Sequence, residues 1–297
     1  MLVTMKEILD KANKENYAVA APNVCTELDT RACIEAAEEL SAPLIIDIAA
    51  EANSDMYFLT QLCRKLAEES NVPIAINLDH GGPYEDIIEA VRSGFTGIMV
   101  DRSSLSFEEN VKEVREIVKI AHAVGISVEA ELGHVGDASQ YEIDRDAALT
   151  DSNDALQFIK ETGVDCLAVA IGTAHGAYPD NYVPYLDFDR LEDIKRTTGY
   201  FPLVLHGSSG TRNEDLRKVC SMGINKVNIC SDLNQAAWEA VMEAKETGAS
   251  SYDFYSILHD GVKNKLKEMI AIYGSINKAW IPVHKGLVKK ETTMKEG

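Results

Sequence analysis

The sequence predicts a protein of the α/β class, a single (β/α)8 TIM barrel with an added C-terminal helix. Short apolar or β-branched runs alternate with longer amphipathic stretches, which is typical of repeated strand and helix units around a parallel sheet. Eight runs qualify as strands, and each is nearly continuously apolar, as expected for strands covered on both faces. The 297 residues are enough for one such barrel.

The predicted elements follow one another without a linker that would divide the chain. Several helices end at a glycine, which readily adopts the left-handed conformation of a helix end. We expect the barrel to occupy residues 1–280 and residues 281–297 to form a polar C-terminal tail. The predicted strands are Tyr17–Ala21, Pro43–Ile48, Pro73–Leu78, Gly97–Asp101, Ile126–Leu132, Cys166–Gly172, Pro202–His206 and Asn225–Cys230. The predicted helices include Tyr84–Ser93, Phe107–Val124, Asp154–Thr162, Arg190–Thr197, Asn213–Met222 and Leu233–Thr247, with Ser251–Tyr273 as the added helix.

Composition and charge exclude several classes of protein. Hydrophobic residues make up 45% of the chain, so it can bury a full core without metal or disulfide staples. Lys and Arg total 29 against 48 Asp and Glu, and the net charge of −19 repels nucleic acid and anionic membranes. The 6 cysteines lack Cys-x-x-Cys spacing, and no export signal is found. We therefore expect a cytoplasmic protein with no nucleic-acid or membrane partner.

Three histidines fall where predicted strands end. His80 closes the third strand, His175 follows the sixth, and His206 follows the seventh. Active sites of these barrels lie at the carboxyl ends of the strands. Three imidazoles that converge there, with an open fourth position, are typical of a catalytic zinc site.

Small and hydroxyl residues accompany two of these histidines. Glycine lets the backbone approach an anion closely, and serine adds a hydroxyl donor where a helix begins. Barrel phosphate sites commonly use the loops after the last two strands. The pattern predicts a phosphate site, although Gly-Ser-Ser-Gly alone is also typical of a simple turn. The candidate residues are Gly176, Gly207, Ser208, Ser209, Asn228, Ile229, Cys230 and Ser231.

Two carboxylates also lie at the predicted mouth. Asp79 precedes His80, and strand alternation is expected to point the two side chains in different directions. Asp79 is a candidate for acid–base chemistry or for orienting a metal ligand. Glu131 ends the fifth strand and is a second candidate, with a structural ion pair as its alternative.

Together these motifs resemble the class II, zinc-dependent ketose-bisphosphate aldolases, which include fructose-bisphosphate and tagatose-bisphosphate aldolases. The resemblance runs from about Met5 to Tyr273, and Leu167–Gly176 looks nearest to the tagatose-type branch. The motifs that carry it are Leu-Asp79-His80-Gly, Val-Glu-Ala-Glu131-Leu-Gly, Ala-Ile-Gly-Thr-Ala-His175-Gly, Leu-His206-Gly-Ser-Ser209-Gly and Asn228-Ile-Cys-Ser231.

The resemblance implies an aldehyde-lyase that reversibly cleaves a ketose (bis)phosphate to dihydroxyacetone phosphate and an aldehyde. It implies a zinc ion held by His80, His175 and His206, with Glu131 as an alternative ligand. Asp79 would move the proton of the substrate's C4 hydroxyl group. Asn23 would contact the substrate, and the glycine and serine motifs would hold its phosphate. The family also implies a monovalent cation, Na⁺ or K⁺, and a homodimer or homotetramer.

The chain departs from its relatives at several positions. Relatives carry an acidic pair in the loop after the fifth strand, and here Glu142 is the best substitute. Arg102 stands where relatives have glycine, which suggests that it contacts the anionic far end of the substrate. An ion pair between Arg102 and a nearby acid is the alternative. Cys230 replaces an aspartate of fructose-bisphosphate enzymes, and Pro22 precedes Asn23 where relatives have an aromatic or small residue.

Two other functions stay open at this point. The same barrel and metal would serve a divergent epimerase or lyase acting on another phosphorylated sugar or sugar acid, because a fold does not fix a reaction. A non-catalytic accessory subunit is the third possibility. The complete histidine set argues against it, because unused ligands would leave polar groups without partners at the mouth.

Overall fold

The computed structural model describes residues 1–136, 149–176, 184–199 and 201–281. Eight parallel strands form one sheet in the order β1-β8-β7-β6-β5-β4-β3-β2. The sheet closes where Asn23 bridges to Asp47 and the backbone N–H of Val24 donates to Asp47 O at 3.0 Å. The strands are β1 (Val19–Pro22), β2 (Leu44–Ala49), β3 (Ile74–Gly81), β4 (Gly97–Val100), β5 (Ser127–Leu132), β6 (Cys166–Val169), β7 (Leu203–Leu205) and β8 (Ile224–Ile229).

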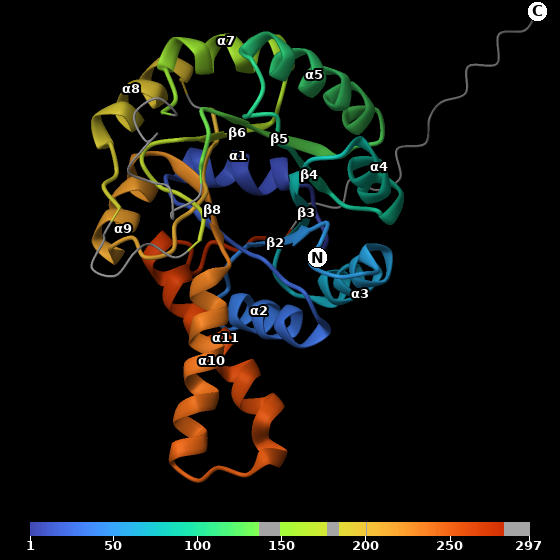
Figure 1. Cartoon of the computed structure of the whole chain (residues 1–297), viewed down its shortest axis with the longest axis vertical. Helices are drawn as coiled ribbons and strands as arrows, with labels where there is room; N and C mark the ends of the chain where they lie inside the picture. The colour runs from blue at the N-terminus through green and yellow to red at the C-terminus, as the bar shows by residue number, and fades with distance from the viewer. Residues whose placement is uncertain (137–148, 177–183, 200, 282–297) are drawn as a thin grey trace, which may run out of the picture.

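Helices surround the barrel, as Figure 1 shows, and the predicted TIM barrel is confirmed. Helix α1 crosses the amino-terminal end of the barrel, and each strand is followed by at least one helix. The described helices are α1 (Met5–Glu15), α2 (Glu27–Glu39), α3 (Met56–Glu69), α4 (Tyr84–Ser93), α5 (Phe107–Ala123), α7 (Ser152–Thr162), α8 (Phe188–Thr198), α9 (Asn213–Met222), α10 (Ser231–Glu246) and α11 (Phe254–Tyr273).

The helix ends follow from local sequence signals. Helix α5 begins with a capping box in which Ser106 and Glu109 bond each other's backbone. Helix α7 begins at Asp151, whose carboxylate accepts from two backbone N–H groups, and Gly163 ends it with φ +75°. The predicted added helix begins later than expected, because Ser251–Asp253 forms a 3₁₀ turn before α11.

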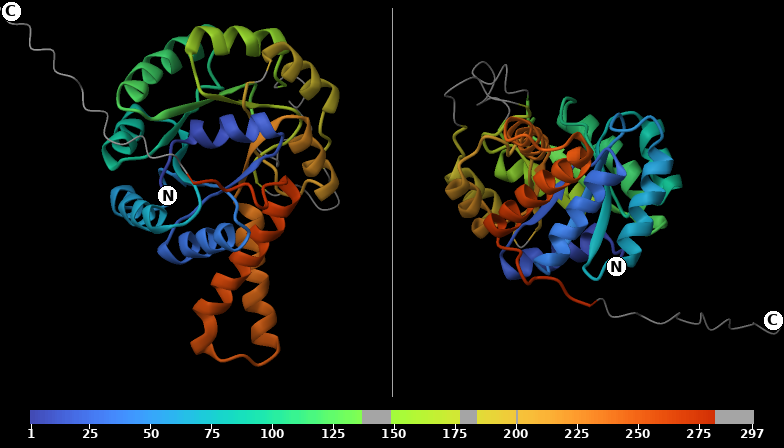
Figure 2. Two further views of the ribbon diagram at one scale, coloured as in Figure 1. Left: turned by 180° about the vertical axis from the view of Figure 1, so that it is seen from behind. Right: turned by 90° about the horizontal axis from the view of Figure 1, so that it is seen from below.

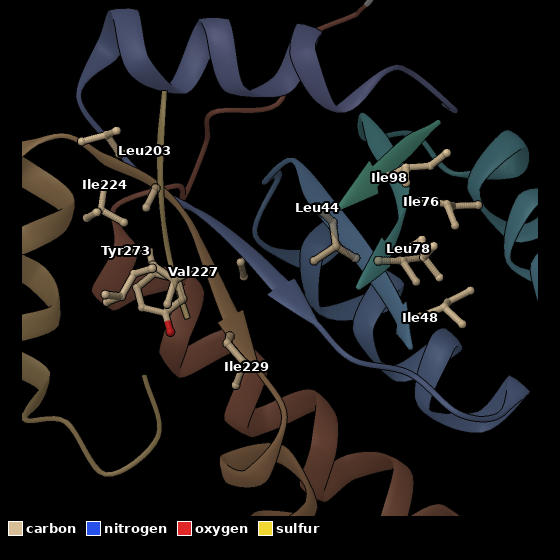
Figure 3. Close-up of a cluster of buried hydrophobic side chains, with 14 of the residues drawn as sticks. Leu44, Ile48, Ile76, Leu78, Ile98, Leu203, Ile224, Val227, Ile229 and Tyr273 are labelled. Atoms are coloured by element: carbon tan, nitrogen blue, oxygen red, sulfur yellow. The ribbon is translucent and has the colours of Figure 1, made fainter. Parts of the chain in front are cut away.

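Alternation along the strands divides the core into two parts. Side chains that point outward pack under the helices, and Figure 3 shows Leu44, Ile48, Ile76, Leu78 and Ile98 in this layer. Side chains that point inward fill the barrel, where α1 covers the lower end with a smaller apolar cluster. The expectation of nearly continuous apolar strands therefore holds for the outward face and for the lower end of the inward face.

The interior of the barrel is polar above this lower cluster. One level holds Asp47, Asn77, Glu129 and Lys226, and all four side chains are fully buried. The next inward positions along the strands bring polar side chains to the mouth. They are Asp79 on β3, Glu131 on β5, His206 after β7 and Asn228 on β8.

Helices α10 and α11 form an arm that projects from the barrel, as Figures 1 and 2 show. The C-terminal part of α11 is buried against the barrel and ends with Tyr273. The projecting part carries exposed apolar side chains, namely Trp238, Met242, Tyr252, Phe254 and Tyr255. Among the described residues, every helix is too short or insufficiently apolar to cross a lipid bilayer.

Candidate active site

The three predicted histidines meet at the carboxyl end of the barrel. The ring centres of His80 and His175 lie 4.7 Å apart, and those of His80 and His206 lie 4.8 Å apart. The third pair, His175 and His206, is separated by 5.7 Å. One nitrogen from each ring lies within 4.8 Å of the others, so the trio forms a candidate metal site.

The unused ring nitrogens fit a bound cation. His80 Nδ1 hydrogen-bonds Asp101 at 2.9 Å, which leaves its Nε2 for the centre of the trio. His206 Nε2 hydrogen-bonds Glu129 at 2.8 Å. The buried atoms His175 Nε2 and His206 Nδ1 have no hydrogen-bond partner among the described residues. A buried polar atom without a partner is costly, and coordination of a metal by both nitrogens would remove that cost.

Burial and neighbouring carboxylates set the charges of the three rings. It lowers the pKa of His175 to about 3 and lowers that of His206, so both rings are neutral near pH 7. Burial acts in the same direction on His80, but Asp101, Asp79 and Glu131 outweigh it and raise the pKa of His80 to about 9. A metal must therefore displace a proton from His80.

Glu131 lies beside the trio in a second, overlapping group of possible ligands formed by His80, Asp101 and Glu131. Its Oε1 accepts from the backbone N–H of Val135 at 2.9 Å, while its buried Oε2 has no hydrogen-bond partner among the described residues. Burial and the nearby Asp101 raise the pKa of Glu131 to about 8. The position and the free oxygen are compatible with the alternative ligand role that the sequence suggested.

His80 lines the cavity beside Asp79, because β3 is irregular at its end. The β3–β4 register shifts between Leu78 and Gly81, and His80 adopts the left-handed conformation with φ +48°. Asp79 and His80 therefore both line one cavity, whereas neighbouring residues of a regular strand point to opposite faces. Strain at a non-glycine residue of this kind is typical of functional sites.

The carboxylate of Asp79 is held by two amides. Asn23 Nδ2 donates to Oδ2 at 2.8 Å, and Asn228 Nδ2 donates to Oδ1 at 2.9 Å. Burial disfavours the charge on Asp79, but His80, His206, Lys226 and the bond from Asn23 outweigh burial and lower its pKa to about 2. Asp79 is therefore a fixed, ionised proton acceptor at neutral pH.

The cavity has a volume of about 280 Å³. One side of it is formed by the loop after β7 and the start of α10, where helix N–H groups lack partners within the helix. The lining residues are Asn23, Ala49, Glu51, Asp79, His80, His175, Gly176, His206, Gly207, Ser208, Ser209, Asn228, Cys230 and Ser231. All but one of the predicted phosphate-site residues are in this set.

Gly207 has a geometry that only glycine allows. Its φ is +63°, and a Cβ atom there would lie 2.5 Å from the backbone oxygen of Ala174. This close approach places the loop after β7 against the loop that carries His175. Ser208 Oγ donates to Asn228 O at 2.7 Å, so the hydroxyl joins the loop after β7 to the end of β8.

Two further predicted residues, Ile229 and Arg102, do not line the cavity. The side chain of Ile229 is fully buried in the outer core and does not line the cavity. Arg102 Nε donates to Glu113 at 2.5 Å, and its Nη1 donates to the backbone oxygens of Gly81 and Asp101. These contacts favour the ion-pair interpretation of Arg102. Glu142 lies outside the described residues, as do residues 282–297 of the predicted tail.

Three residues that the sequence reasoning missed belong to the site. Asp101 bonds His80, Glu129 bonds His206, and Lys226 Nζ lies 2.9 Å from Glu129 Oε2. Strand alternation was the available signal for Glu129, which lies two residues before Glu131 and so shares its face. The position of Asp101, directly after β4, was the signal for that residue.

A barrel with a histidine-lined cavity at the carboxyl ends of its strands is typical of a metal-dependent enzyme. Comparison with known proteins gives the class more closely. The family model described as "Fructose-bisphosphate aldolase class-II" matches residues 3–278, and the chain belongs to this family. It is an aldehyde-lyase, and its reaction cleaves a ketose bisphosphate to dihydroxyacetone phosphate and an aldehyde.

Individual relatives agree with the family assignment. The chain is 38% identical to a fructose-bisphosphate aldolase of Thermus caldophilus over 306 residues, covering 94% of this chain and 100% of that protein. A fructose-bisphosphate aldolase of Helicobacter pylori is also 38% identical, with the same coverage. The crystal structure of the YdjI aldolase from Escherichia coli K12 matches with a TM-score of 0.83 and 33% identity, covering 94% of this chain and 100% of that chain.

Proposed function

We propose that the protein is a zinc-dependent aldolase in which His80, His175 and His206 hold the metal and Glu131 offers an alternative ligand. The observation that carries this proposal is the convergence of three imidazole nitrogens, two of them buried without a hydrogen-bond partner. Zinc bound there would act as a Lewis acid on the carbonyl oxygen of the ketose. The remaining chemistry falls to the side chains around it.

Asp79 is the proposed group for the proton of the C4 hydroxyl. It is ionised at neutral pH and accepts two amide hydrogen bonds that fix its position in the cavity. In the cleavage direction its carboxylate takes the C4 hydroxyl proton while the C3–C4 bond breaks, and it returns the proton in the synthetic direction. Asn23 and Asn228 hold the carboxylate during both steps.

The phosphate of dihydroxyacetone phosphate is proposed to bind between the loop after β7 and the start of α10. Backbone N–H groups at Gly207, Ser209 and Ser231 are the proposed donors. Ser231 begins α10, where the helix start leaves such groups unpaired and favours negative charge. Gly176 completes this side of the cavity. A monovalent cation, Na⁺ or K⁺, is proposed beside the phosphate by analogy with the family.

The substrate is proposed to be a ketose phosphate of the tagatose type. The segment Leu167–Gly176 is the feature that supports this branch. Glu142 remains the proposed loop base that removes a proton from bound dihydroxyacetone phosphate. Cys230 lines the cavity where fructose-bisphosphate enzymes carry an aspartate, which fits a changed preference for the sugar.

Substitution of Arg102 tests whether the residues that follow β4 bind the anionic end of the aldehyde. Because its guanidinium already bonds Glu113 and two backbone oxygens, we expect Arg102→Ala to leave the KM for the aldehyde within twofold of wild type. If Arg102→Ala raises the KM for a phosphorylated aldehyde tenfold and leaves the KM for an uncharged aldehyde unchanged, Arg102 contacts the anionic end of the substrate directly.

The assembly is proposed to be a homodimer or homotetramer that uses the α10–α11 arm. The arm exposes aromatic side chains at fractions that include 63% for Trp238 and 70% for Tyr255. Apolar groups gathered on a projecting element are typical of a protein interface.

The test of the proposed function compares cleavage of tagatose 1,6-bisphosphate and fructose 1,6-bisphosphate by the zinc-loaded protein, with triose phosphate release as the readout. We expect cleavage of both to stop after chelation, to return with zinc, and to be faster for the tagatose compound. Equal rates or a preference for fructose would reject the tagatose-type branch. Retention of full activity and bound metal in His80→Ala would reject the proposed zinc site.

A further inference from the structure

We propose that Glu129 is a positioning residue of the metal centre, which fixes the orientation and tautomer of His206, and that Lys226 holds Glu129 in place as its buried counter-ion. This inference rests on the zinc site proposed above. It concerns a level of the barrel below the substrate cavity, since neither Glu129 nor Lys226 lines that cavity.

The contact between Glu129 and His206 determines which ring nitrogen faces the metal. Glu129 Oε1 and His206 Nε2 lie 2.8 Å apart, and both side chains are fully buried. A neutral imidazole carries one proton, and a carboxylate beside Nε2 keeps that proton on Nε2. The lone pair is then on Nδ1, the buried atom without a hydrogen-bond partner, and Nδ1 is the nitrogen left for a metal shared with the other two histidines.

The same arrangement occurs on a second ligand. Asp101 bonds Nδ1 of His80, which leaves Nε2 for the metal. The two carboxylates thus bond opposite nitrogens of their histidines. Carboxylates that bond the second nitrogen of a ligating histidine orient the ring and strengthen it as a ligand.

Lys226 accounts for the charge of Glu129 inside the barrel. Its Nζ lies 2.9 Å from Glu129 Oε2 and 3.2 Å from Asp47 Oδ2, and all three side chains are fully buried. Asn77 Nδ2 donates to the other oxygen of Asp47 at 2.9 Å. Together these contacts form a buried chain from Asn77 through Asp47, Lys226 and Glu129 to His206.

Stability alone is a weak reason for such a chain. Burying charges costs desolvation energy, and apolar side chains of similar volume often stabilise a core as well as a buried ion pair does. The lower part of the barrel is filled with apolar side chains such as Ile45, Met99 and Val204. The buried charged side chains are therefore found directly below the proposed metal centre. A role in positioning a metal ligand explains this location.

The test replaces Glu129 with glutamine, which keeps an oxygen acceptor of similar size and removes the negative charge. We expect Glu129→Gln to weaken zinc binding by 10- to 100-fold, the usual effect of losing such a partner. We expect kcat to fall with it at limiting zinc, while the KM for the ketose phosphate stays within twofold. Zinc affinity is measured by competition with a chromophoric chelator, and the cobalt-substituted protein should show a changed d–d absorption spectrum.

A matched control is Asp165→Asn. Asp165 also bonds a histidine, since its Oδ2 lies 2.8 Å from His122 Nε2, but this pair does not belong to the trio. Zinc affinity and the cobalt spectrum should be unchanged in the control. If Glu129→Gln binds zinc within twofold of wild type with the same spectrum, the positioning role is rejected while the zinc site stands. If wild type binds no zinc, the proposed function fails instead.

A measurement on the unaltered protein covers the case in which the variant does not fold. Nitrogen-15 NMR of histidine-labelled, zinc-loaded wild type reports which nitrogen of His206 carries the proton, with His206→Gln used to assign the signals. We expect a protonated Nε2 and a metal-bound Nδ1. The reverse pattern would overturn the proposal.

Discussion

Asp79 combines two properties at the scale of one residue. It is ionised at neutral pH because neighbouring positive charge outweighs its burial, and two asparagine amides fix both of its oxygens. A base with a low pKa accepts protons weakly in the ground state. It must therefore act where the C4 hydroxyl proton becomes acidic, at the moment of carbon–carbon bond cleavage.

The first prediction follows from this role. Asp79→Asn keeps the size of the side chain but removes the proton acceptor, so kcat for cleavage should fall by about 10²- to 10⁴-fold. Exchange of the C3 proton of dihydroxyacetone phosphate with heavy water should continue, because that step does not involve the C4 hydroxyl. Both rates are measured on protein of equal zinc content. Loss of both reactions together would assign Asp79 a different role.

The second prediction concerns zinc binding and pH. In the metal-free protein His80 has a pKa of about 9, and zinc must displace its proton. Affinity should therefore rise with pH up to about 9, by roughly tenfold per pH unit for one displaced proton. Competition titrations at pH 6.5, 7.5 and 8.5 measure this slope.

The control for the slope is Asp101→Asn. The bond from Asp101 is the largest influence that raises the pKa of His80, so its loss should shift the rise in affinity to lower pH. A zinc affinity that does not change between pH 6.5 and 8.5 in wild type would contradict the assignment of His80 as a protonated ligand.

At the scale of elements, the loops after β6 and β7 depend on one close backbone contact. Gly207 lies against Ala174, and a Cβ atom would overlap the Ala174 oxygen at 2.5 Å. Backbone cannot yield as a flexible side chain does, so the contact sets the distance between the loops that carry His175 and the proposed phosphate donors.

The third prediction compares two glycines of the site. Gly207→Ala should raise the KM for dihydroxyacetone phosphate at least tenfold and lower stability by about 2 kcal/mol, because the two loops must separate. Gly176→Ala is the control. Its φ is +89°, but no atom lies within 4 Å of the added Cβ, so we expect the free energy of unfolding to fall by only about 1 kcal/mol. Enzyme kinetics and thermal unfolding give both quantities. Equal effects of the two substitutions would show that the close contact does not matter.

The same scale shows how far the sequence predicted the elements. All eight predicted strands are present, with ends displaced by at most three residues. The apolar run of the sixth strand continues to Gly172, but β6 ends at Val169 because Ala170 N–H donates to Thr150 Oγ1 at 2.8 Å instead of to a strand. Local apolar character does not reveal such a partner, which lies 20 residues away.

At the scale of the whole molecule, the arm formed by α10 and α11 exposes apolar side chains that the barrel does not cover. The barrel buries its own core, whereas α10, the 3₁₀ turn and the start of α11 leave five large apolar side chains exposed. Such a surface is costly in water unless another surface covers it. The proposed homo-oligomer would cover it.

The fourth prediction tests the arm. Trp238→Ser combined with Tyr255→Ser should shift the protein toward monomers in sedimentation velocity, because apolar area at the interface is lost. The circular dichroism spectrum should be unchanged, since both side chains are exposed. Tyr84→Ser, which changes a half-exposed aromatic residue on α4, serves as the control. An unchanged oligomer in the double variant would place the interface elsewhere.

The sequence by itself determined the barrel, the approximate places of its strands and the histidines, because apolar periodicity and short motifs are local. It also led to the family, since those motifs are specific in combination. The tertiary structure alone decided that Asp79 and His80 face one cavity, that Arg102 is held by Glu113, and that Lys226 pairs with Glu129 beneath His206. Lys226 and Glu129 are 97 positions apart in the sequence, and only closure of the barrel brings such side chains together.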